Sequence, residues 1–464
     1  MKAIRIGCGA GYAGDRIDPA KELVKKGNLD YLILEGLAER TTAIAQLQKS
    51  EDADKGYGAF LEERMEELLP LCKEKGTTLI TNLGAANPKA ALKHVERIKK
   101  ELKLDSLLAA AVTGSDVLEQ ILPTDNKIWE TKEKLSDTEL DIISADAYLG
   151  VEQILPALKE GADIIITGRV ADPSLFLAAM VYEFSWELND WHKLGKGTIF
   201  SHLLECAAQV TGGYFADTYY KQIDDLWNVG LPIVEINEDG EGFITKTPGT
   251  GGNVTVQTCK EQLLYEVMNP SEYITPDVTA DFSNVYFTEE EPNVIRVENG
   301  SGRERTDTLK VTLGVDKGYL GEGMISYAGH HALERSKLAE KIIQERIKKR
   351  SLRFTDIKYE LLGLNALHGS TSSNERIEPY EVLLRVAALA EDKYQAEQIG
   401  NEVESLWLNG PGGPGGVRKN TKRVISAYST LIARESIESH MITKDEGLNG
   451  TNPAERNRPR PIWG

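Results

Sequence analysis

The chain has 464 residues, of which 41% are hydrophobic and 27% are charged, and its formal net charge is −18. This composition is typical of a globular protein and excludes wholesale disorder, and the length predicts two or three domains. Because an acidic surface repels phosphate backbones and anionic lipid, we expect neither nucleic acid nor a membrane as the main partner.

The four cysteines are far apart in the sequence and form no CxxC pair. This spacing argues against a disulfide framework and against a cysteine-based zinc site, and it fits a reducing compartment. The sequence has no apolar run of about 18 residues and does not begin with the pattern of a signal peptide. We therefore expect a cytoplasmic protein.

Short apolar runs alternate with amphipathic stretches in the first half of the chain. The runs at 3–6, 31–34, 78–81, 107–112, 142–144 and 164–167 are predicted as buried strands. Helical patterns lie between them at 19–26, 61–75, 88–102 and 150–160, with Asp18 and Asn87 as predicted N-caps before proline. This alternation predicts βαβ units, and therefore an α/β domain with a mainly parallel sheet flanked by helices.

The rest of the chain follows other patterns. Residues 175–295 are irregular, with a helix expected at about 202–211 and a hairpin at about 233–245, and are interpreted as an insertion in an α/β domain at 1–300. From 308 onwards the pattern is β-α-β-β-α-β, which predicts a split-βαβ (ferredoxin-like) α+β domain at 301–440. Residues 441–464 are predicted to form a surface tail.

Polar and glycine-rich segments recur where the predicted strands end, at 7–16, 81–88, 113–116, 144–150 and 167–174. The carboxyl ends of parallel strands meet at one edge of a sheet, where α/β proteins bind their ligands. We therefore predict that these loops line one cleft. A glycine-rich loop at 247–253, which contains Gly251 and Gly252, is expected to face it and could hold an oxyanion or a diphosphate.

The first of these loops contains Gly9-x-Gly11-x-x-Gly14, and Glu35 ends the next predicted strand. This spacing resembles a dinucleotide-binding fingerprint, in which the third glycine opens the helix. Here residues 15–18 come before the helix, so a phosphate could not lie directly on its N-terminus. The alternative is a turn that brings Asp15 and Arg16 into the site.

Polar residues lie just beyond the other strand ends: Asn82, Asn87, Asp116, Asp146, Arg169 and Asp172. Asp116 and Asp146 are predicted as catalytic carboxyl groups and the others as ligand-binding residues, although Asn87 and Asp172 could instead cap helices. Arg169 needs a partner at the mouth of a buried sheet. That partner is either a substrate carboxylate or phosphate, or an internal salt bridge to Asp146 or Asp172.

His202, Glu205 and Cys206 share one face of the expected helix. The group could form a thiol–imidazole pair or half of a metal site, and the alternative is ordinary helix packing. Because no second cluster in the sequence supplies further ligands, we predict no metal. His202 and Cys206 are predicted as catalytic residues.

Several of these segments resemble the acyclic terpene utilisation (AtuA-type) family. The resemblance extends over about residues 1–435 and includes ITNLGAANP, TGRVADPSLF, HLLECAAQVTGGYFAD, TPDVTADF and LWLNGPGGPGG. The family is named after bacterial degradation of citronellol and geraniol, which proceeds through branched acyl-CoA thioesters. The resemblance therefore implies a small anionic substrate that is a branched or unsaturated acid, free or as a CoA thioester.

These observations lead to the hypothesis of an enzyme with lyase or hydratase chemistry, which needs a general base, a general acid and donors that stabilise an enolate. Two alternatives stay open. One is a nucleotide-dependent oxidoreductase, and the other is a non-catalytic partner subunit that binds acyl-CoA. The sequence identifies no cofactor. An amphipathic helix at 333–349 and the size of the chain lead us to expect a homo-oligomer.

Overall fold

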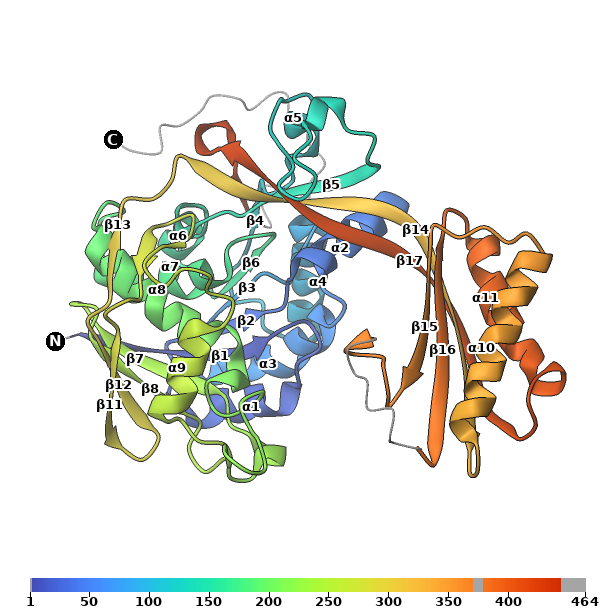
Figure 1. Cartoon of the computed structure of the whole chain (residues 1–464). Helices are drawn as coiled ribbons and strands as arrows, with labels where there is room; N and C mark the ends of the chain where they lie inside the picture. The colour runs from blue at the N-terminus through green and yellow to red at the C-terminus, as the bar shows by residue number, and fades with distance from the viewer. Residues whose placement is uncertain (1, 370–378, 444–464) are drawn as a thin grey trace. The chain divides into compact units, whose positions relative to one another are not determined.

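The computed structural model describes residues 2–369 and 379–443, which divide into two compact units (Figure 1). Unit 1 contains the described residues up to 138, 143–314 and those from 427 onwards, and unit 2 contains 139–142 and 315–426. Of the tail predicted at 441–464, residues 444–464 lie outside the described part of the chain. The domain limits predicted from the sequence stay a prediction.

Unit 1 is built on a mixed sheet that has ten strands among the described residues. The central strands are parallel, in the order β1 (Ala3–Gly11), β2 (Tyr31–Glu35), β3 (Thr78–Thr81), β6 (Ile164–Thr167) and β4 (Ala109–Thr113). Every residue of β2 and β6 is buried, because helices cover both faces of a parallel sheet, and this explains their nearly continuous apolar sequence. The predicted α/β class is confirmed.

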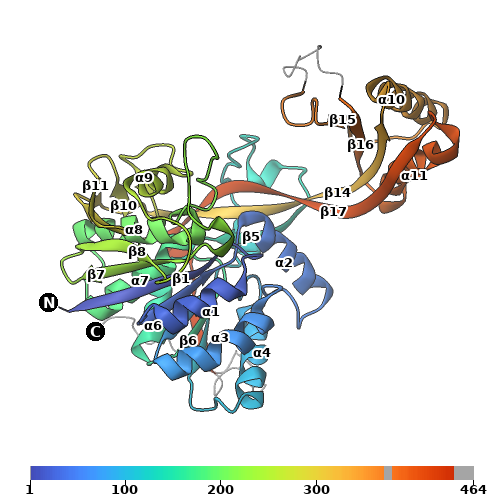
Figure 2. The same ribbon diagram turned by 90° about the horizontal axis from the view of Figure 1, so that it is seen from below.

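The helices of unit 1 form two groups. α1 (Ile17–Lys26), α3 (Leu61–Lys75) and α4 (Pro88–Glu101) pack in succession, as right-handed crossovers between β1, β2, β3 and β4 require (Figure 2). α6 (Val151–Lys159), α7 (Asp172–Phe184) and α8 (Trp191–Glu205) pack together as the second group. Two further helices, α2 (Glu39–Glu51) and the short α5 (Leu118–Ile121), follow β2 and β4.

Two predicted helix starts have different outcomes. The side chain of Asn87 accepts a hydrogen bond from the backbone N–H of Ala90, so its role as the N-cap of α4 is confirmed. The prediction that Asp18 caps α1 is wrong, because α1 begins at Ile17 with Arg16 as the N-cap. Asp18 instead lies in the first turn, where a negative charge also favours the helix dipole.

Antiparallel strands extend the sheet on both sides. β7 (Pro232–Asn237) pairs with β1, and β8 (Gly242–Lys246), β12 (Val294–Glu298) and β11 (Tyr286–Glu291) follow in that order, which includes the expected hairpin. At the other edge, β18 (His440–Thr443) pairs with β4. A separate small sheet contains β9 (Tyr273–Ile274), β10 (Thr279–Asp281) and β13 (Ser301–Arg303), and α9 (Val256–Leu264) contacts α8 and β11.

Two expected elements differ in the structure. The strand at 142–144 exists as β5 (Ile142–Ala147), but it pairs with β14 (Thr308–Ala328) instead of joining the parallel strands. The helix expected at 202–211 is α8, which begins at Trp191 and ends at Glu205. Gly195 and Gly197 lower the helix propensity of its first half, so the sequence pattern did not indicate a helix there. Gly195 is required because a Cβ atom there would lie 2.3 Å from the carbonyl oxygen of Ser301.

Unit 2 contains, in chain order, β14 from residue 315 onwards, α10 (Ala332–Lys349), β15 (Asp356–Leu362), β16 (Glu381–Ala390), α11 (Lys393–Asn409) and β17 (Pro414–Ala433) up to residue 426. Its strands lie in the order β15-β16-β14-β17, and both helices pack against β16. The core between them contains Ile325, Ile343, Val386 and Val403, all buried. The assignment of this unit to the split-βαβ class stays a prediction.

The contact between β14 and α11 allows no side chain at Gly321, since a Cβ atom there would lie 1.8 Å from the carbonyl oxygen of Ala396. We expect Gly321→Ala to lower the free energy of unfolding of unit 2 by about 1–3 kcal/mol, the usual cost of overpacking. The measurement is urea unfolding followed by circular dichroism. Gly415→Ala is the matched control, because no atom lies within 4 Å of its Cβ position. Equal midpoints for the two variants would contradict this packing.

Candidate functional site

A cavity of about 490 Å³ lies in unit 1 at the carboxyl ends of β1, β2 and β6. The residues that line it are 11–13, 35, 37–39, 41, 148, 169, 171–173, 205–206, 265–266, 273–276, 306 and 308–310. This is the edge of a parallel sheet where ligands are expected, and the volume is in the range of small-molecule sites. We therefore take this cavity as the candidate functional site.

The glycine motif shapes one side of the cavity. The register between β1 and β2 shifts between Cys8 and Ala10, so Gly9 is the extra residue of a bulge and Gly11 lies opposite Glu35. A Cβ atom on Gly11 would lie 2.5 Å from the carbonyl carbon of Cys206. The backbone at 206–207 thus occupies the space above Gly11 that a dinucleotide phosphate would need, which argues against the dinucleotide interpretation.

Asp15 and Arg16 hold the loop after β1 without lining the cavity. One carboxylate oxygen of Asp15 accepts a hydrogen bond from the backbone N–H of Gly11 at 3.0 Å. The buried Arg64 donates to the carbonyl groups of Ala13 and Asp15, both at 3.0 Å. Arg16 is exposed and donates to the carbonyl of Trp227 at 3.2 Å. Both predicted ligand-binding residues therefore act on the shape of the loop.

Arg169 is the buried cation of the cavity, with only 2% of its surface exposed. Its Nη1 donates to the carbonyl of Leu37, its Nη2 lies 3.2 Å from Oδ1 of Asp172, and its guanidinium carbon is 4.1 Å from the centre of the Tyr148 ring. Its Nε has no hydrogen-bond partner among the described residues. Arg169 thus has an internal carboxylate partner and, among the described residues, one buried N–H without a partner.

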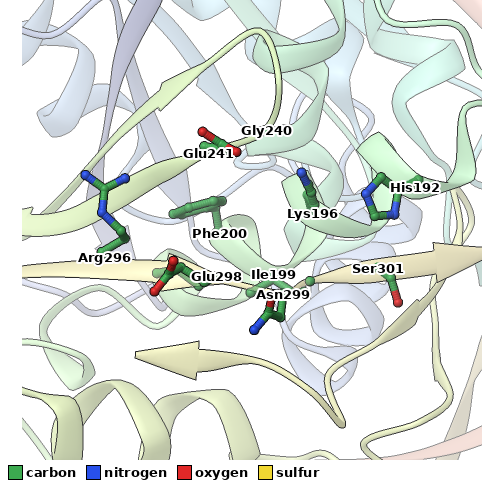
Figure 3. A pocket seen from close by; sticks show the side chains of 12 residues that line it. His192, Lys196, Ile199, Phe200, Gly240, Glu241, Arg296, Glu298, Asn299 and Ser301 are labelled. Carbon is green, nitrogen blue, oxygen red and sulfur yellow. The ribbon is translucent and has the colours of Figure 1, made fainter. Parts of the chain in front are cut away.

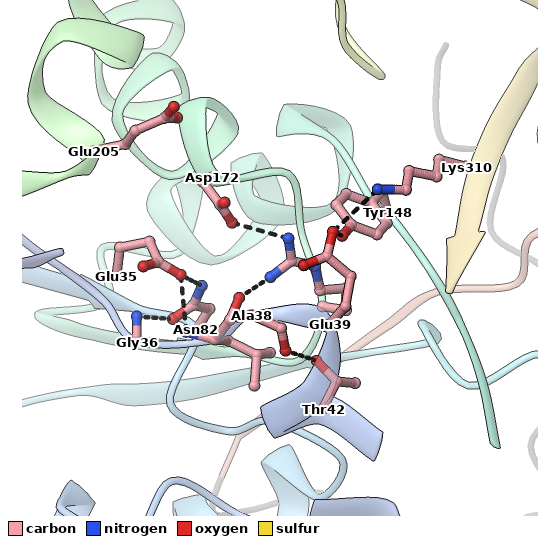
Figure 4. Close-up of polar contacts among 12 residues, drawn as sticks. Glu35, Gly36, Ala38, Glu39, Thr42, Asn82, Tyr148, Asp172, Glu205 and Lys310 are labelled. Atoms are coloured by element: carbon pink, nitrogen blue, oxygen red, sulfur yellow. Dashed lines mark hydrogen bonds and ion pairs between the residues drawn. The ribbon is translucent and has the colours of Figure 1, made fainter. Parts of the chain in front are cut away.

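Figure 4 shows the carboxyl groups of Glu35, Glu39 and Asp172, which differ in their tendency to ionise. Burial opposes ionisation of Glu39, but the Tyr148 hydroxyl and the charges of Arg169 and Lys310 lower its pKa to about 2. Burial raises the pKa of Asp172 well above its ordinary value, and Arg169 offsets this only in part because Glu35, Glu205 and Glu39 are close. The cavity thus holds a firmly ionised carboxylate and a carboxyl group that favours its proton.

Glu35 connects the cavity to the layer behind it. Its carboxylate accepts hydrogen bonds from the backbone N–H of Leu37 at 2.8 Å and from the side-chain amide of Asn82 at 3.0 Å, and burial still raises its pKa. The oxygen of the same amide accepts from the backbone N–H of Gly36 at 2.9 Å. Asn82 therefore positions Glu35 and does not itself line the cavity.

Glu205 and Cys206 line the cavity at the end of α8, and His202 lies behind them. Nδ1 of His202 lies 2.6 Å from Oε1 of Glu205, so in the described structure the imidazole contacts this carboxylate and not the thiol of Cys206. Burial and the nearby Glu205 charge raise the pKa of Cys206 well above its ordinary value. Cys206 is therefore a thiol at neutral pH, which weakens it as a nucleophile.

The structure places the remaining predicted residues away from the cavity wall. Asp146 is buried, and the side-chain amide of Gln46 donates to its two oxygens at 3.0 and 3.1 Å. Asp116 forms an exposed ion pair with Lys49 at 3.2 Å.

Three more predicted ligand-binding residues serve the local structure. Asn87 caps α4 and also donates to the carbonyl groups of Ala53 and Lys55. Gly251 and Gly252 pack closely against the backbone of Asp225 and Thr211, and neither lines the cavity. The loop at 247–253 therefore does not form a wall of this site.

Sequence reasoning missed Glu39, Tyr148 and Lys310 among the lining residues. Glu39 follows the end of β2, so the strand-end argument used for the other loops would have found its segment. Tyr148 lies inside a predicted loop but has no charge to single it out. Lys310 belongs to β14, and only the tertiary structure brings its amino group within 3.0 Å of Glu39.

A second cavity of about 400 Å³ lies near α8 and β12 (Figure 3). Lys196 and Arg296 line it together with Glu241 and Glu298, so its charges are mixed. Lys196 donates to the carbonyl of Asp239 at 3.0 Å, and Arg296 forms an ion pair with Glu290. It is not at the carboxyl ends of the parallel strands, and its two cations already have partners, so it is the weaker candidate.

Comparison with known proteins identifies one family. A family model described as "Acyclic terpene utilisation family protein AtuA" matches residues 4–443. No curated protein and no solved structure matches the chain. Within residues 2–369 and 379–443, no helix has the length and apolar character needed to cross a bilayer, and no group of three or more His, Cys, Asp or Glu residues could hold a metal ion.

The buried carboxyl group of Asp146 predicts a pH effect on stability. Burial and the charge of Asp116 raise its pKa to about 7, whereas an unfolded Asp titrates near 4. Between these values the folded chain holds a proton that the unfolded chain has lost, so the free energy of unfolding falls as the pH rises and levels off above about 7.

Asp146→Asn cannot ionise and should remove this contribution, which is on the order of 4 kcal/mol at about 1.4 kcal/mol per pH unit. The measurement is urea unfolding of wild type and variant at several pH values across this window. Asp105→Asn, at an exposed position, is the matched control. A constant difference between wild type and Asp146→Asn at all pH values would show that Asp146 is ionised in the folded chain.

Proposed function

Because the chain belongs to the acyclic terpene utilisation family AtuA, we propose that it is an enzyme of small branched or unsaturated acid catabolism. It acts on the free acid or its CoA thioester by lyase or hydratase chemistry. The observation that supports this best is the carboxyl group of Asp172, which favours its proton in the cavity beside Arg169. A carboxyl group whose pKa is raised by burial can act as a general acid near neutral pH.

Arg169 is the proposed binding partner of the substrate carboxylate or thioester oxygen. Its Nε has no partner among the described residues, so a substrate oxygen would complete its hydrogen bonds. When Asp172 carries its proton, Arg169 also loses its internal counter-charge and attracts an anion more strongly. As charge develops on the oxygen of an enolate, a fixed cation next to it lowers the barrier of the reaction.

Asp172 is the proposed general acid. It is the first residue of α7, and one third of its side chain remains exposed to the cavity, so its proton is accessible to a ligand. Glu39, in contrast, is held ionised by Tyr148 and Lys310 and is a weak base because of its low pKa. We assign Glu39 the role of a fixed negative charge that orients Tyr148 and Lys310.

The rest of the wall suits a branched hydrocarbon chain. Apolar and aromatic side chains line it, namely Leu37, Tyr148, Tyr265, Tyr273, Ile274, Pro276 and Leu309. Thr41, Glu266, Thr275, Thr306 and Thr308 also line the cavity, so the wall is mixed. Apolar side chains together with a few placed polar groups are typical of a small-molecule site. A small acid with an apolar branch matches both parts.

A non-catalytic subunit that binds acyl-CoA would use the same cavity and is the alternative that stays open. The oxidoreductase alternative is weaker, because the backbone of Cys206 lies over Gly11. Cytoplasmic location and a homo-oligomeric state stay predictions.

The proposed acid can be tested with 3-methylbut-2-enoyl-CoA, a small branched unsaturated thioester. We expect wild type to hydrate it, which removes the absorbance of the conjugated thioester, and Asp172→Asn to lower kcat by roughly 10²–10⁴-fold, the usual contribution of general acid catalysis. Asp54→Asn makes the same chemical change at an exposed site paired with Lys93, and should leave kcat unchanged. A wild-type chain that binds the thioester without converting it would favour the non-catalytic alternative.

The anion-binding role of Arg169 predicts a graded effect on affinity. We expect Arg169→Ala to weaken the binding of 3-methylbut-2-enoate by about 1.5–3 kcal/mol, the range for hydrogen bonds to charged groups. Arg169→Lys should restore only part of this, because an ammonium group cannot reproduce the guanidinium geometry. Titration calorimetry measures both, with Arg97→Ala at an exposed helix position as control. Unchanged affinity in Arg169→Ala would exclude Arg169 as the anion-binding residue.

A further inference from the structure

Glu205 and His202 form a buried pair at the edge of the candidate site. Nδ1 of His202 lies 2.6 Å from Oε1 of Glu205, and the two side chains are 1% and 10% exposed. Oε2 of Glu205 and Nε2 of His202 have no hydrogen-bond partner within the part of the chain that the structure describes. Glu205 lines the cavity, and its unpartnered oxygen is itself buried.

The ring of His202 is held in one orientation. It stacks on Phe282 with ring centres 5.5 Å apart and lies 5.0 Å from the centre of the Tyr273 ring. The side-chain amide of Gln262 donates to the carbonyl of His202 at 3.0 Å, which fixes the last turn of α8. These contacts leave Nδ1 aimed at Glu205.

The hydrogen-bonding chemistry of His202 and Glu205 indicates which ring nitrogen of His202 carries the hydrogen. A carboxylate oxygen only accepts hydrogen bonds, and a neutral imidazole donates through one nitrogen and accepts through the other. The short contact therefore places the hydrogen on Nδ1, which donates to Oε1. This arrangement, in which a histidine orients a neighbouring carboxylate, leaves the lone pairs of Oε2 free to accept a proton.

We propose that Glu205 is the general base of the reaction proposed above and that His202 is its positioning residue. This inference rests on the proposed function. Figure 4 shows Glu205 near Asp172 and Glu35, and Glu205 and Asp172 both line the candidate cavity. The site thus pairs a base held by an imidazole with the acid beside Arg169.

In the proposed step, one water molecule adds to the carbon–carbon double bond of the unsaturated thioester. Oε2 of Glu205 removes a proton from a water molecule, and the water oxygen forms a bond to the β-carbon of the unsaturated thioester. The electron pair of the carbon–carbon double bond moves toward the thioester oxygen beside Arg169 and gives an enolate. Asp172 then delivers a proton to the α-carbon, and the proton held by Glu205 returns to Asp172 through solvent. The net change is the addition of one water molecule.

Three variants distinguish the role of Glu205 as the base from the role of His202 as its positioning residue. Glu205→Gln keeps the shape and still accepts a hydrogen bond from Nδ1, but it cannot accept a proton. His202→Asn can donate from an amide nitrogen near the position of Nδ1, whereas His202→Leu cannot donate at all. With 3-methylbut-2-enoyl-CoA as the probe, we expect Glu205→Gln to lower kcat by roughly 10²–10⁴-fold with little change in KM. His202→Leu should lower kcat, and His202→Asn should restore much of it.

Matched controls and a substrate-independent measurement complete the test. His94→Leu and His94→Asn change a histidine that contacts the Tyr57 ring outside the cavity, and they should leave kcat unchanged. Nitrogen NMR of the ¹⁵N-histidine-labelled full chain, assigned with His202→Asn, should show the hydrogen of His202 on Nδ1. A hydrogen on Nε2 alone would overturn the pair as proposed.

The kinetic outcomes distinguish this inference from the proposed function. If Glu205→Gln hydrates the probe like wild type while Asp172→Asn does not, the inference is overturned and the proposed function stands. If the wild-type chain does not convert the probe, the proposed function fails and the inference fails with it. Equal losses in His202→Asn and His202→Leu would overturn the positioning role of His202.

Discussion

A guanidinium group buried at the end of β6 is the constraint on which the candidate site depends. A buried charge is costly unless it is paired and hydrogen-bonded. The chain meets this need with groups from separate segments, namely the carbonyl of Leu37, the carboxylate of Asp172 and the ring of Tyr148. The loops after β2, β5 and β6 are therefore held around one side chain.

The same constraint explains why the nearby carboxyl groups differ. One buried cation cannot compensate for several buried carboxylates, so these compete for its charge. Glu39 has additional partners in Tyr148 and Lys310 and stays ionised, whereas Asp172 lacks them and favours its proton. A difference in protonation that suits acid–base chemistry thus arises from an unequal distribution of hydrogen-bond donors.

The comparison between sequence and structure is instructive at individual residues. The strand-end argument led to Gly11, Arg169 and Asp172, which line the cavity, because parallel strands deliver their loops to one edge. The same argument also selected Asn87 and Asp116, which lie elsewhere, because turn residues and ligand-binding residues have the same composition. The lining residues at 265–266 and 308–310 follow no strand end of the parallel sheet, and their place in the wall depends on contacts between distant parts of the chain.

The sequence by itself determined the family, the α/β class and the positions along the chain of most central strands of unit 1. These properties follow from local periodicity and from motifs that are contiguous in the chain. Only the tertiary structure decided that His202 contacts Glu205 and not Cys206, that the backbone of Cys206 covers Gly11, and that Lys310 reaches Glu39. Each of these depends on where α8 ends or on how β14 lies, and helix ends and long-range packing are set by contacts that no local pattern encodes.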